Sequence, residues 1–400
     1  MNQYLSRLQP YPFEKLRALY EPVRPASAYS PIALHIGEPR HPTPDFIKQA
    51  LTQSLSSLSQ YPATAGTAEL RQAIARWLCR RYGLPAIDPG AQVLPVNGTR
   101  EALFAIAQLI IDQRRAQPLV VCPNPFYQIY EGAALLAGAT PYFVNATSAS
   151  GFAGDFGAIP ESVWQRVQLL YACSPANPSG RVMTLEEWRL LFELSDRYGF
   201  VIACDECYSE LYLDESRPPL GSLEAAHRLG RGDFSRLVMF SSLSKRSNVP
   251  GMRSGFVAGD ASVLKSFLLY RTYHGGAMSP PVQSASVAAW NDEQHVRENR
   301  RLYAAKFREV APLIGAPLQV SLPEGGFYLW VRTPVDDTTF ARDLYAAYNV
   351  SVLPGSFLAR DAHGENPGRN HVRLALVAPL AECLEAARRL CDFTRKMHTP

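Results

Sequence analysis

The sequence predicts an α/β fold, in which a mostly parallel β-sheet is covered by helices and is followed by a smaller α+β domain. Two observations carry this prediction. Between residues 118 and 241, short runs that are apolar throughout alternate with helical segments, which is typical of strands buried on both faces of a parallel sheet. After about residue 281 this regular alternation stops, and 400 residues are enough for both domains.

Each expected strand of the larger domain is a short apolar run that follows a helical segment or a turn. These runs are Pro118 to Cys122, Thr140 to Val144, Val167 to Ala172, Phe200 to Cys204 and Leu237 to Ser241. Helices are expected over Glu101 to Arg114, Tyr130 to Ala137 and Thr184 to Tyr198. The last helix begins with Thr184 and Glu187 at the spacing of a capping box.

The rest of the chain predicts a long helix and then a smaller set of strands and helices. The helix covers residues 281–310, and the later elements are strands at 326–331, 350–353 and 371–376, a helix at 338–348 and a final helix from 380. We therefore expect a large domain over residues 46–280 and a small domain over residues 281–400. The proline-rich residues 1–45 are expected to pack with the small domain.

Composition and charge exclude several classes of function. The net charge is only +4 and no basic run stands out, so no nucleic-acid partner is predicted. No apolar stretch reaches the ~18 residues of a membrane span, and the N-terminus lacks the apolar core of a signal peptide. The seven scattered cysteines are typical of a cytoplasmic protein. Cys204 and Cys207 form a CxxC without a second pair, so no metal site is predicted.

Polar side chains follow the ends of the expected strands, where they could carry chemistry. They are Asn177 in SPANPSG, Asp205 and Tyr208 in DECYSE, Ser242 and Lys245 in SSLSK, and Arg253 in PGMRSG. Because ligands of parallel α/β sheets bind beyond the carboxyl ends of the strands, these side chains are expected to meet around one cofactor.

Together these motifs resemble the class I and II aminotransferases of fold type I, and the resemblance covers essentially the whole chain. It implies pyridoxal 5′-phosphate as cofactor, with Lys245 as the amine that condenses with the cofactor aldehyde. It implies that Asp205 keeps the pyridine nitrogen protonated, so that the ring can take up electrons from the substrate Cα. Tyr208 and Asn177 match the family's donors to the phenolic oxygen of the ring.

The resemblance also implies a cradle for the cofactor phosphate. Ser242, three residues before the lysine, and Arg253, eight residues after it, match the family pattern. In VNGTREAL, the residues Gly98, Thr99 and Arg100 open a helix, whose first backbone N–H groups suit a phosphate.

Two tyrosines complete the implied cofactor site. Tyr127 in PNPFYQIY resembles the aromatic residue that stacks on the ring, although Phe126 and Tyr130 lie beside it in sequence. Tyr61 in QYPATAGTAELR resembles the tyrosine that reaches the phosphate of a neighbouring subunit. The resemblance therefore implies a homodimer with shared active sites.

Arg373 and Gly37 are the implied substrate contacts, together with Asn177. Arg373 in HVRLAL resembles the arginine that grips the substrate α-carboxylate, for which a planar guanidinium supplies two parallel bonds. A buried arginine needs such an anion, or an internal carboxylate, as its partner. Gly37 in HIGEP matches a loop that passes so close to the substrate that a side chain would collide.

The runs SLSKRSNVPGMRSGFVAGD, RTYHGGAMSPPVQSAS and LHIGEPRHPTP are similar to those of the N-succinyl-diaminopimelate aminotransferases of proteobacteria. This resemblance implies amino transfer between N-succinyl-LL-2,6-diaminoheptanedioate and 2-oxoglutarate, in the synthesis of lysine and peptidoglycan precursors. The succinylated substrate carries further carboxylates, so further cations are expected near the site. The candidates are Arg24, Arg40, His41, Arg100, His274 and Arg360.

Other functions remain open from the sequence. An aminotransferase for aspartate, alanine or aromatic acids, or a C–S β-lyase, would share the fold and the cofactor. A cofactor-sensing domain of a transcription regulator would need a DNA-binding module, and neither the first 45 residues nor the C-terminal tail shows a helix-turn-helix pattern.

Overall fold

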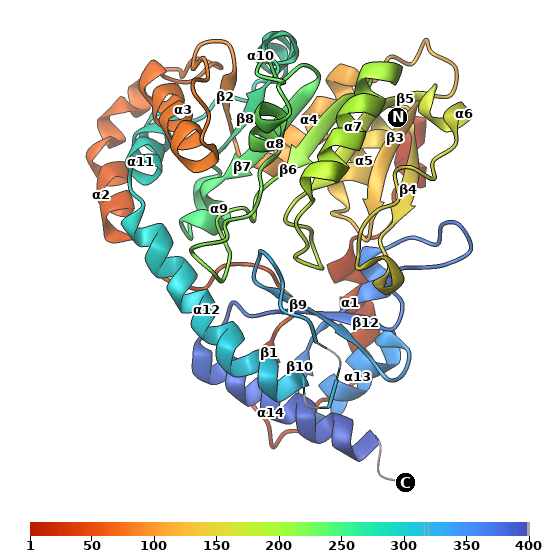
Figure 1. Ribbon diagram of the computed structural model, residues 1–400. Helices are drawn as coiled ribbons and strands as arrows, with labels where there is room; N and C mark the ends of the chain where they lie inside the picture. Colours follow the sequence, from red (N-terminus) through yellow and green to blue (C-terminus); the bar gives the residue numbers. More distant parts are fainter. Residues whose placement is uncertain (316, 319, 398–400) are drawn as a thin grey trace.

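A computed structural model of the chain describes residues 1–315, 317–318 and 320–397. The chain forms a large lobe and a small lobe, seen at the top and bottom of Figure 1. The long helix α12 (Gln294–Gly315) runs from one lobe to the other. None of the described helices is both long and apolar enough to cross a membrane.

The described part of the large lobe is built on a seven-stranded sheet. Its order is β2 (Val93–Val96), β8 (Gly255–Gly259), β7 (Leu237–Ser242), β6 (Val201–Asp205), β5 (Val167–Cys173), β3 (Leu119–Asn124) and β4 (Thr140–Asn145). Strand β8 is antiparallel to both neighbours, and the other neighbouring strands are parallel. The mostly parallel sheet expected from the sequence is therefore confirmed.

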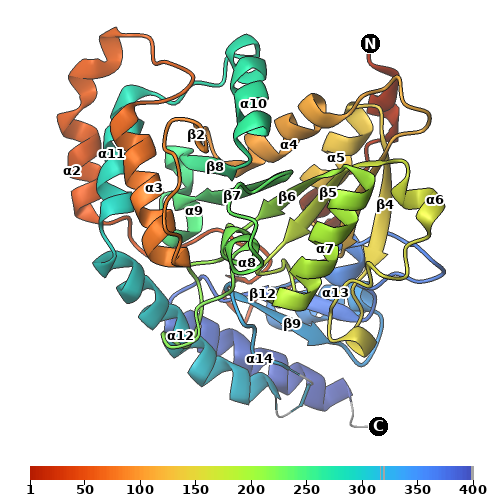
Figure 2. The same ribbon diagram turned by 45° about the horizontal axis from the view of Figure 1, so that its top comes forward.

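Helices cover both faces of this sheet (Figure 2). In β3, Leu119 and Val121 join one hydrophobic core, and Val120 and Cys122 join the other. This alternation buries both faces, which explains why the strands are apolar throughout. The first core includes buried side chains of α3 (Ala68–Tyr82), α7 (Leu185–Tyr198), α8 (Ser222–Arg228) and α11 (Pro280–Asn291). The second includes those of α4 (Thr99–Ile110), α5 (Ile129–Leu136) and α10 (Ala261–His274).

The predicted capping box at the start of α7 is confirmed. The Thr184 hydroxyl accepts a hydrogen bond from the backbone N–H of Glu187, and the Glu187 carboxylate accepts one from the backbone N–H of Thr184. The helix ends at Gly199, whose φ of 76° is a left-handed conformation that suits glycine.

The single helix expected over residues 281–310 is wrong, because two helices occupy this stretch. Asp292 is extended between α11 and α12, and its carboxylate accepts a hydrogen bond from the backbone N–H of His295 at 3.0 Å. Such a side chain satisfies a free N–H group in the first turn of the new helix. Trp290 of α11 packs on Trp77 of α3, with ring centroids 4.9 Å apart. We therefore propose a large-domain boundary after α11.

The small lobe contains two short sheets and the helices α13 (Asp337–Tyr348) and α14 (Leu380–Met397). Strands β11 (Leu353–Pro354), β12 (His371–Ala375) and β9 (Tyr328–Arg332) form an antiparallel sheet. Strand β1 (Ile32–Ala33) pairs in parallel with β10 (Val350–Ser351). The single strand expected over 350–353 is therefore divided between two sheets.

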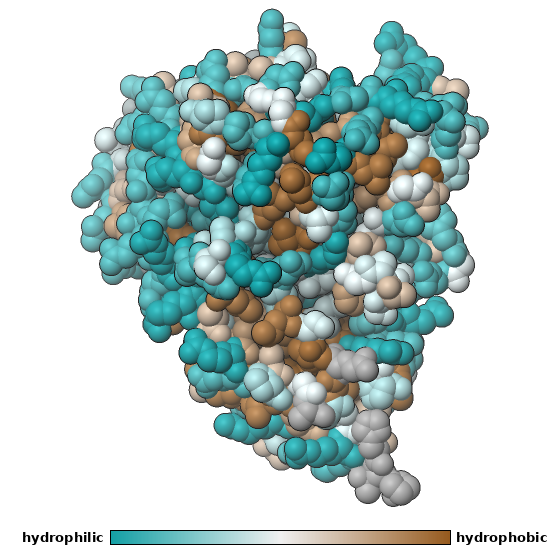
Figure 3. All heavy atoms as spheres, in the orientation of Figure 1, coloured by the Kyte–Doolittle hydropathy of each residue, from teal (hydrophilic) through white to brown (hydrophobic). Residues whose placement is uncertain are grey.

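The N-terminal segment crosses from one lobe to the other. Its helix α1 (Pro12–Tyr20) buries Leu16 in a cluster with Trp330 and Leu353 of the small lobe. Farther along, α2 (Asp45–Gln53) packs on α11 in the large lobe. On the face seen in Figure 3, hydrophilic residues cover most of the outer edge, and hydrophobic residues lie mainly toward the middle.

Candidate active site

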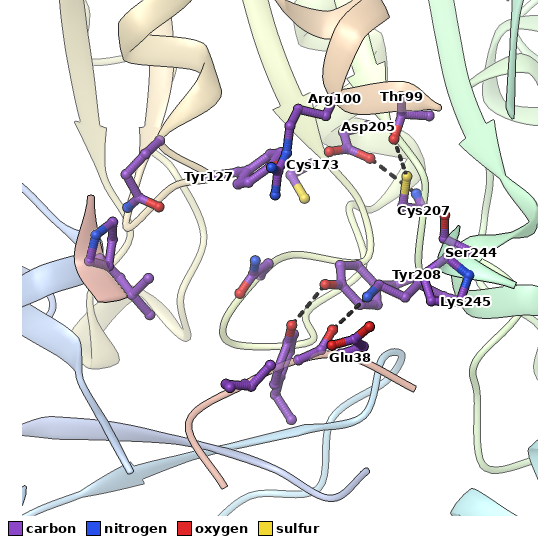
Figure 4. Close-up of a pocket in the computed structure, with 18 of the residues that line it drawn as sticks. Glu38, Thr99, Arg100, Tyr127, Cys173, Asp205, Cys207, Tyr208, Ser244 and Lys245 are labelled. Carbon is purple, nitrogen blue, oxygen red and sulfur yellow. Dashed lines mark hydrogen bonds between the residues drawn. The ribbon is translucent and has the colours of Figure 1, made fainter. Parts of the chain in front are cut away.

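A cavity of about 500 Å³ lies at the carboxyl ends of the parallel strands, facing the small lobe. Most of the predicted site residues line it. They are Gly37, Thr99, Arg100, Tyr127, Asn177, Asp205, Tyr208, Ser242, Lys245, Arg253 and Arg373. In Figure 4, Asp205 and Thr99 lie across the cavity from Glu38, which belongs to the N-terminal segment.

Lys245 reaches the cavity from α9 (Leu243–Arg246), the short helix directly after β7. Its Nζ donates a hydrogen bond of 2.5 Å to the backbone oxygen of Gly37. Burial lowers the pKa of Lys245 to about 8, and the positive charges of Arg373 and Arg253 add to this shift. About a tenth of the amine is therefore uncharged at pH 7, far more than for an ordinary lysine, and the uncharged form is the nucleophile.

Asp205, the last residue of β6, is a buried carboxylate without a cationic partner among the described residues. One oxygen accepts the Tyr130 hydroxyl at 2.9 Å, and the other accepts the backbone N–H of Cys207 at 3.1 Å. Burial raises the pKa of Asp205, and these hydrogen bonds oppose the shift. A positively charged ligand group would stabilise the ionised form.

The loop before α4 forms a second wall with Arg253. A Cβ on Gly98 would collide with the Arg253 guanidinium, and the φ of 83° at Gly98 also favours glycine. No side chain caps the helix that Gly98 precedes, so its first N–H groups are available to an anion. The Thr99 hydroxyl lies 3.0 Å from the thiol of Cys207 (Figure 4).

Tyr127 and Tyr130 both line the cavity, whereas Phe126 is packed in the core. The Tyr130 side chain is buried and its hydroxyl is bonded to Asp205, so Tyr127 is the partly exposed aromatic residue of the motif. The Tyr127 hydroxyl accepts a hydrogen bond of 2.6 Å from Nε of Arg100. Stacking of Tyr127 on a cofactor ring remains a prediction.

Arg373 is a buried guanidinium without a carboxylate partner among the described residues. It donates to the side-chain oxygen of Asn177 and to the backbone oxygen of His35, each at 3.0 Å, and its Nε has no partner. Its guanidinium carbon lies 4.2 Å from the ring centroid of Tyr328. An anionic ligand would supply the missing charge.

Several cavity residues were not assigned to the site by sequence reasoning, and three of them carry polar groups of particular interest. Tyr328 donates or accepts a 2.9 Å hydrogen bond with the Tyr208 hydroxyl, and its own hydroxyl packs against Gly37. Glu38 and Cys207 also line the cavity. A signal was available for Tyr328, since its strand GGFYLW could have been expected beside the strand of Arg373.

The cations proposed for further substrate carboxylates lie elsewhere, with the exception of Arg100. Arg40 pairs with Glu382, Arg360 is bonded through two nitrogens to Glu131, His274 lies near Glu101, and Arg24 is exposed outside the cavity. His41 is bonded to side chains of α12. Most of these residues have partners within the chain, which the sequence could not reveal.

Gly98 and Tyr61 do not line the cavity. Gly98 lies behind it, against Arg253, whereas Tyr61 is fully exposed. The position of Tyr61 leaves its predicted contact with a neighbouring subunit untested. In the described residues, no group of His, Cys, Asp and Glu side chains could hold a metal ion.

The fold and the cavity define an enzyme that handles amino and carboxyl groups, and comparison with known proteins identifies its family. Residues 30–390 match the family model of the class I and II aminotransferases, so the chain belongs to that family. The family uses pyridoxal 5′-phosphate and acts on amino acids and 2-oxo acids.

Three particular relatives show how the chain compares within this family. An aminotransferase structure from Neisseria meningitidis Z2491 is 53% identical, covers 99% of this chain and 100% of its own, and has a TM-score of 0.96. A probable N-succinyldiaminopimelate aminotransferase from Thermus thermophilus is 26% identical, with coverages of 95% and 98% and a TM-score of 0.83. An LL-diaminopimelate aminotransferase of Desulforudis audaxviator is 30% identical, and the match covers 96% of each chain.

The cavity fits pyridoxal 5′-phosphate by the chemistry of its walls. A buried carboxylate without a counter-charge suits a protonated pyridine nitrogen, and a partly neutral lysine suits an aldehyde. The uncapped helix beside Arg253 suits a phosphate. The residues that would hold the group are Asp205, Lys245, Thr99, Ser242 and Arg253.

Proposed function

We propose that this aminotransferase exchanges an amino group between N-succinyl-LL-2,6-diaminoheptanedioate and 2-oxoglutarate, as a step of diaminopimelate and lysine synthesis. The main support for amino transfer is that two buried, charged side chains of one cavity have no partner of opposite charge among the described residues. Asp205 needs a cation and Arg373 needs an anion, and Lys245 lies in the same cavity. An amino acid bound with its α-carboxylate on Arg373 would present its amino group to this site.

The chain's own residues can be assigned to the steps of this reaction. When bound, pyridoxal phosphate supplies an aldehyde for the amino group and a ring that takes up electrons as the substrate Cα loses its proton. Lys245 would accept this proton from the substrate Cα on its amine and would later donate it at a different carbon from the one that lost it. Asp205 would hold the ring nitrogen protonated, and Tyr208 and Asn177 would contact the ring oxygen. Gly37 leaves room for the substrate beside Tyr328.

Two similarities support the proposed substrate. One is to the Thermus protein, and the other is the resemblance of three sequence runs to the N-succinyl-diaminopimelate aminotransferases. Arg100 is an exposed cation that lines the cavity, and its side chain, unlike that of the exposed Arg253, is not assigned to the cofactor phosphate, so it could meet a distal carboxylate. Its guanidinium is bonded to the Tyr127 hydroxyl, which would hold it in place without neutralising it.

A second candidate is transfer from unacylated LL-diaminopimelate. The diaminopimelate relative supports it, and so does Glu38, an exposed carboxylate that lines the cavity and could pair with a free distal ammonium. Both substrates carry a distal carboxylate, but succinylation removes the distal ammonium and adds a second carboxylate, so only the unacylated substrate favours an anion at the cavity entrance.

A substrate panel tests both candidates. Purified protein would be mixed with each amino donor, and the loss of cofactor absorbance would be followed in single turnovers. We expect the succinylated substrate to react with a larger kcat/KM than LL-diaminopimelate, aspartate, alanine or aromatic amino acids. A preference for LL-diaminopimelate would replace the proposal by the second candidate, and pyruvate release from cystathionine would indicate a β-lyase.

We also propose that the enzyme is a cytoplasmic homodimer in which Tyr61 contributes to the neighbouring site. Large apolar side chains are exposed on this chain, which supports a covered surface. They include Leu55, Leu58, Tyr61, Leu269 and Tyr273. All seven cysteines are free thiols, as expected in the cytoplasm.

Mixing two inactive variants tests the shared site. In a mixed dimer of Lys245→Ala and Tyr61→Ala, one of the two sites retains both native residues. Random reassociation should restore about a quarter of native activity. No restoration in dimers shown to have mixed would reject the role of Tyr61.

A further inference from the structure

A buried lysine lies outside the cavity and is not used by the proposed chemistry. Lys306 of α12 is 3% exposed and has no carboxylate within ion-pair distance among the described residues. Its Nζ lies 2.7 Å from Nε2 of His41 and donates to the backbone oxygen of Val377 at 3.2 Å. Burying an ammonium without a counter-charge costs folding free energy, so the buried position of Lys306 needs an explanation.

The chemistry of the donors fixes the direction of a hydrogen-bond chain that begins at Lys306. A lysine ammonium has no acceptor lone pair, so Nε2 of His41 accepts and the proton of the ring lies on Nδ1. This Nδ1 donates to the side-chain oxygen of Asn299 at 2.7 Å. The Asn299 amide nitrogen then donates to the backbone oxygen of Lys245 at 3.2 Å.

This chain connects segments that carry the main groups of the site. We call residues 35–41 the strap, because they cross the cavity between β1 and α2, and 36–38 line it. His41 ends the strap, and the strap residue Gly37 accepts the hydrogen bond from the Lys245 amine. Val377 follows the strand that carries Arg373.

The strap has few other strong attachments at its His41 end. Arg40 forms an ion pair with Glu382, but its side chain is 48% exposed, and such pairs contribute little. At the other end, His35 is bonded to Ser351 and to Arg373. The bonds of His41 to the buried side chains of Asn299 and Lys306 are therefore the main polar attachment at this end of the strap.

We propose that Lys306 is a positioning residue, which acts through His41 and Asn299 to hold the strap across the cavity and to fix the backbone of Lys245. The inference rests on the proposed roles of Lys245 and Arg373. In this role the buried ammonium of Lys306 contributes to substrate binding. A strap that is held at both ends keeps the space beside Gly37 in its binding shape before the substrate arrives.

The substitution Lys306→Met tests this role, since methionine retains an unbranched apolar stem and removes the donors. Lys306→Gln retains a neutral donor group and should lie closer to the native protein. Lys48→Met is the matched control, because Lys48 is an exposed lysine on α2, just after the strap. Circular dichroism and thermal melting establish that each variant is folded.

The first readout is limited trypsin digestion of the cofactor-free protein. Arg40 lies in the strap, so cleavage after Arg40 reports how often the strap is released. We expect Lys306→Met to speed this cleavage about tenfold, the effect of a lost buried hydrogen bond, relative to cleavage after Arg114 in an exposed loop. Lys48→Met should leave the ratio within about twofold of the native value.

The second readout is the split between KM and kcat with glutamate as amino donor and isotopically labelled 2-oxoglutarate as amino acceptor. Lys306→Met should raise KM about tenfold and change kcat by less than about threefold, because the loss falls on binding. Native cleavage and native KM in folded Lys306→Met would overturn the proposal. If this variant does not fold, His41→Phe decides by the same readouts, since it retains the ring contact with Tyr303 and removes both nitrogens.

The two readouts also separate this inference from the proposed function. Glutamate as donor does not depend on the succinylated substrate, and trypsin digestion does not depend on catalysis. A protein inactive with every donor but cleaved faster after Arg40 in Lys306→Met would reject the function and retain the anchoring role.

Discussion

Two buried polar clusters of this molecule satisfy their charges in different ways. In the cavity, Asp205 and Arg373 form no ion pair among the described residues, although each is almost fully buried. In the cluster on α12, each polar group between Lys306 and the Lys245 backbone meets a partner in the chain. The difference indicates that the first cluster is completed by ligands, whereas the second serves the fold that holds them.

The largest expected effect is that of Lys245→Ala, which removes the amine from the cavity whose buried charges we expect ligands to neutralise. We expect a loss of at least ~10⁴-fold in turnover, since both the covalent attachment and the proton transfer depend on this group. The measurement is steady-state amino transfer, with borohydride trapping of the cofactor on the native chain. Lys265→Ala, at an exposed position of α10, should retain native activity. Residual activity within about tenfold of native would contradict the role of Lys245.

Asp205→Asn should produce the next largest loss, about 10³-fold in kcat. Asparagine has nearly the same shape and can still accept a hydrogen bond from the Cys207 N–H, but it carries no charge for the ring nitrogen. Glu206→Gln is a matched control, because Glu206 is also buried but is bonded to Tyr82 and Ser222 away from the cavity. If Glu206→Gln lowered kcat as much as Asp205→Asn, the effect would be structural.

The contrast between the clusters also shows what the sequence could predict. Strand ends are local features, so the runs that form β5, β6 and β7 were enough to place Asn177, Asp205 and Lys245 at one edge of the sheet. The α12 cluster depends on partners more than 200 positions apart, such as His41 and Lys306, and no local pattern marks them. For the same reason the sequence did not reveal the break at Asp292, where side-chain capping outweighs helical periodicity.

Arg373→Lys tests the anion-binding half of the cavity. Lysine retains the charge but cannot form two parallel bonds, so KM for amino acids should rise about 100-fold with a smaller change in kcat. Arg360→Lys is the control, because Arg360 is already neutralised by Glu131 and lies outside the cavity. An equal rise in KM for both variants would show that Arg373 does not bind the α-carboxylate.

A smaller effect is expected at the mouth of the cavity, where Arg100 and Glu38 have opposite charges. Arg100→Gln should lower kcat/KM for the succinylated substrate about tenfold and affect LL-diaminopimelate less, because an exposed charge pair is weak. Glu38→Gln should shift the ratio in the opposite direction. The measurement is the ratio of kcat/KM for the two substrates. If both variants kept the native ratio of kcat/KM for the two substrates, residues other than Arg100 and Glu38 would determine which substrate is preferred.

The smallest effect expected is a pH dependence of stability that distinguishes the two buried amines. Burial lowers the pKa of Lys306 to about 8, against the raising effect of Cys383 and with the help of Arg40, and the pKa of Lys245 is also about 8. Their ordinary value is 10.5, so between pH 8 and 10.5 the unfolded chain binds more protons than the folded one. The free energy of unfolding should therefore gain a contribution from each amine as pH rises through this window, and the contribution should be flat below pH 8.

Subtracting the denaturation curves of Lys306→Met and Lys245→Met from those of the native protein isolates each contribution, because the other titrating groups cancel. In the cofactor-free protein both differences should rise with pH by similar amounts. Loading with pyridoxal phosphate should change the pH dependence of the Lys245 difference, because that amine becomes bonded to the ligand, and leave the pH dependence of the Lys306 difference unaltered, because the Lys306 amine lies outside the cavity. If the pH dependence of the Lys306 difference changed on loading, the Lys306 amine would be in contact with the ligand site, and its assignment as a positioning residue outside that site would be wrong.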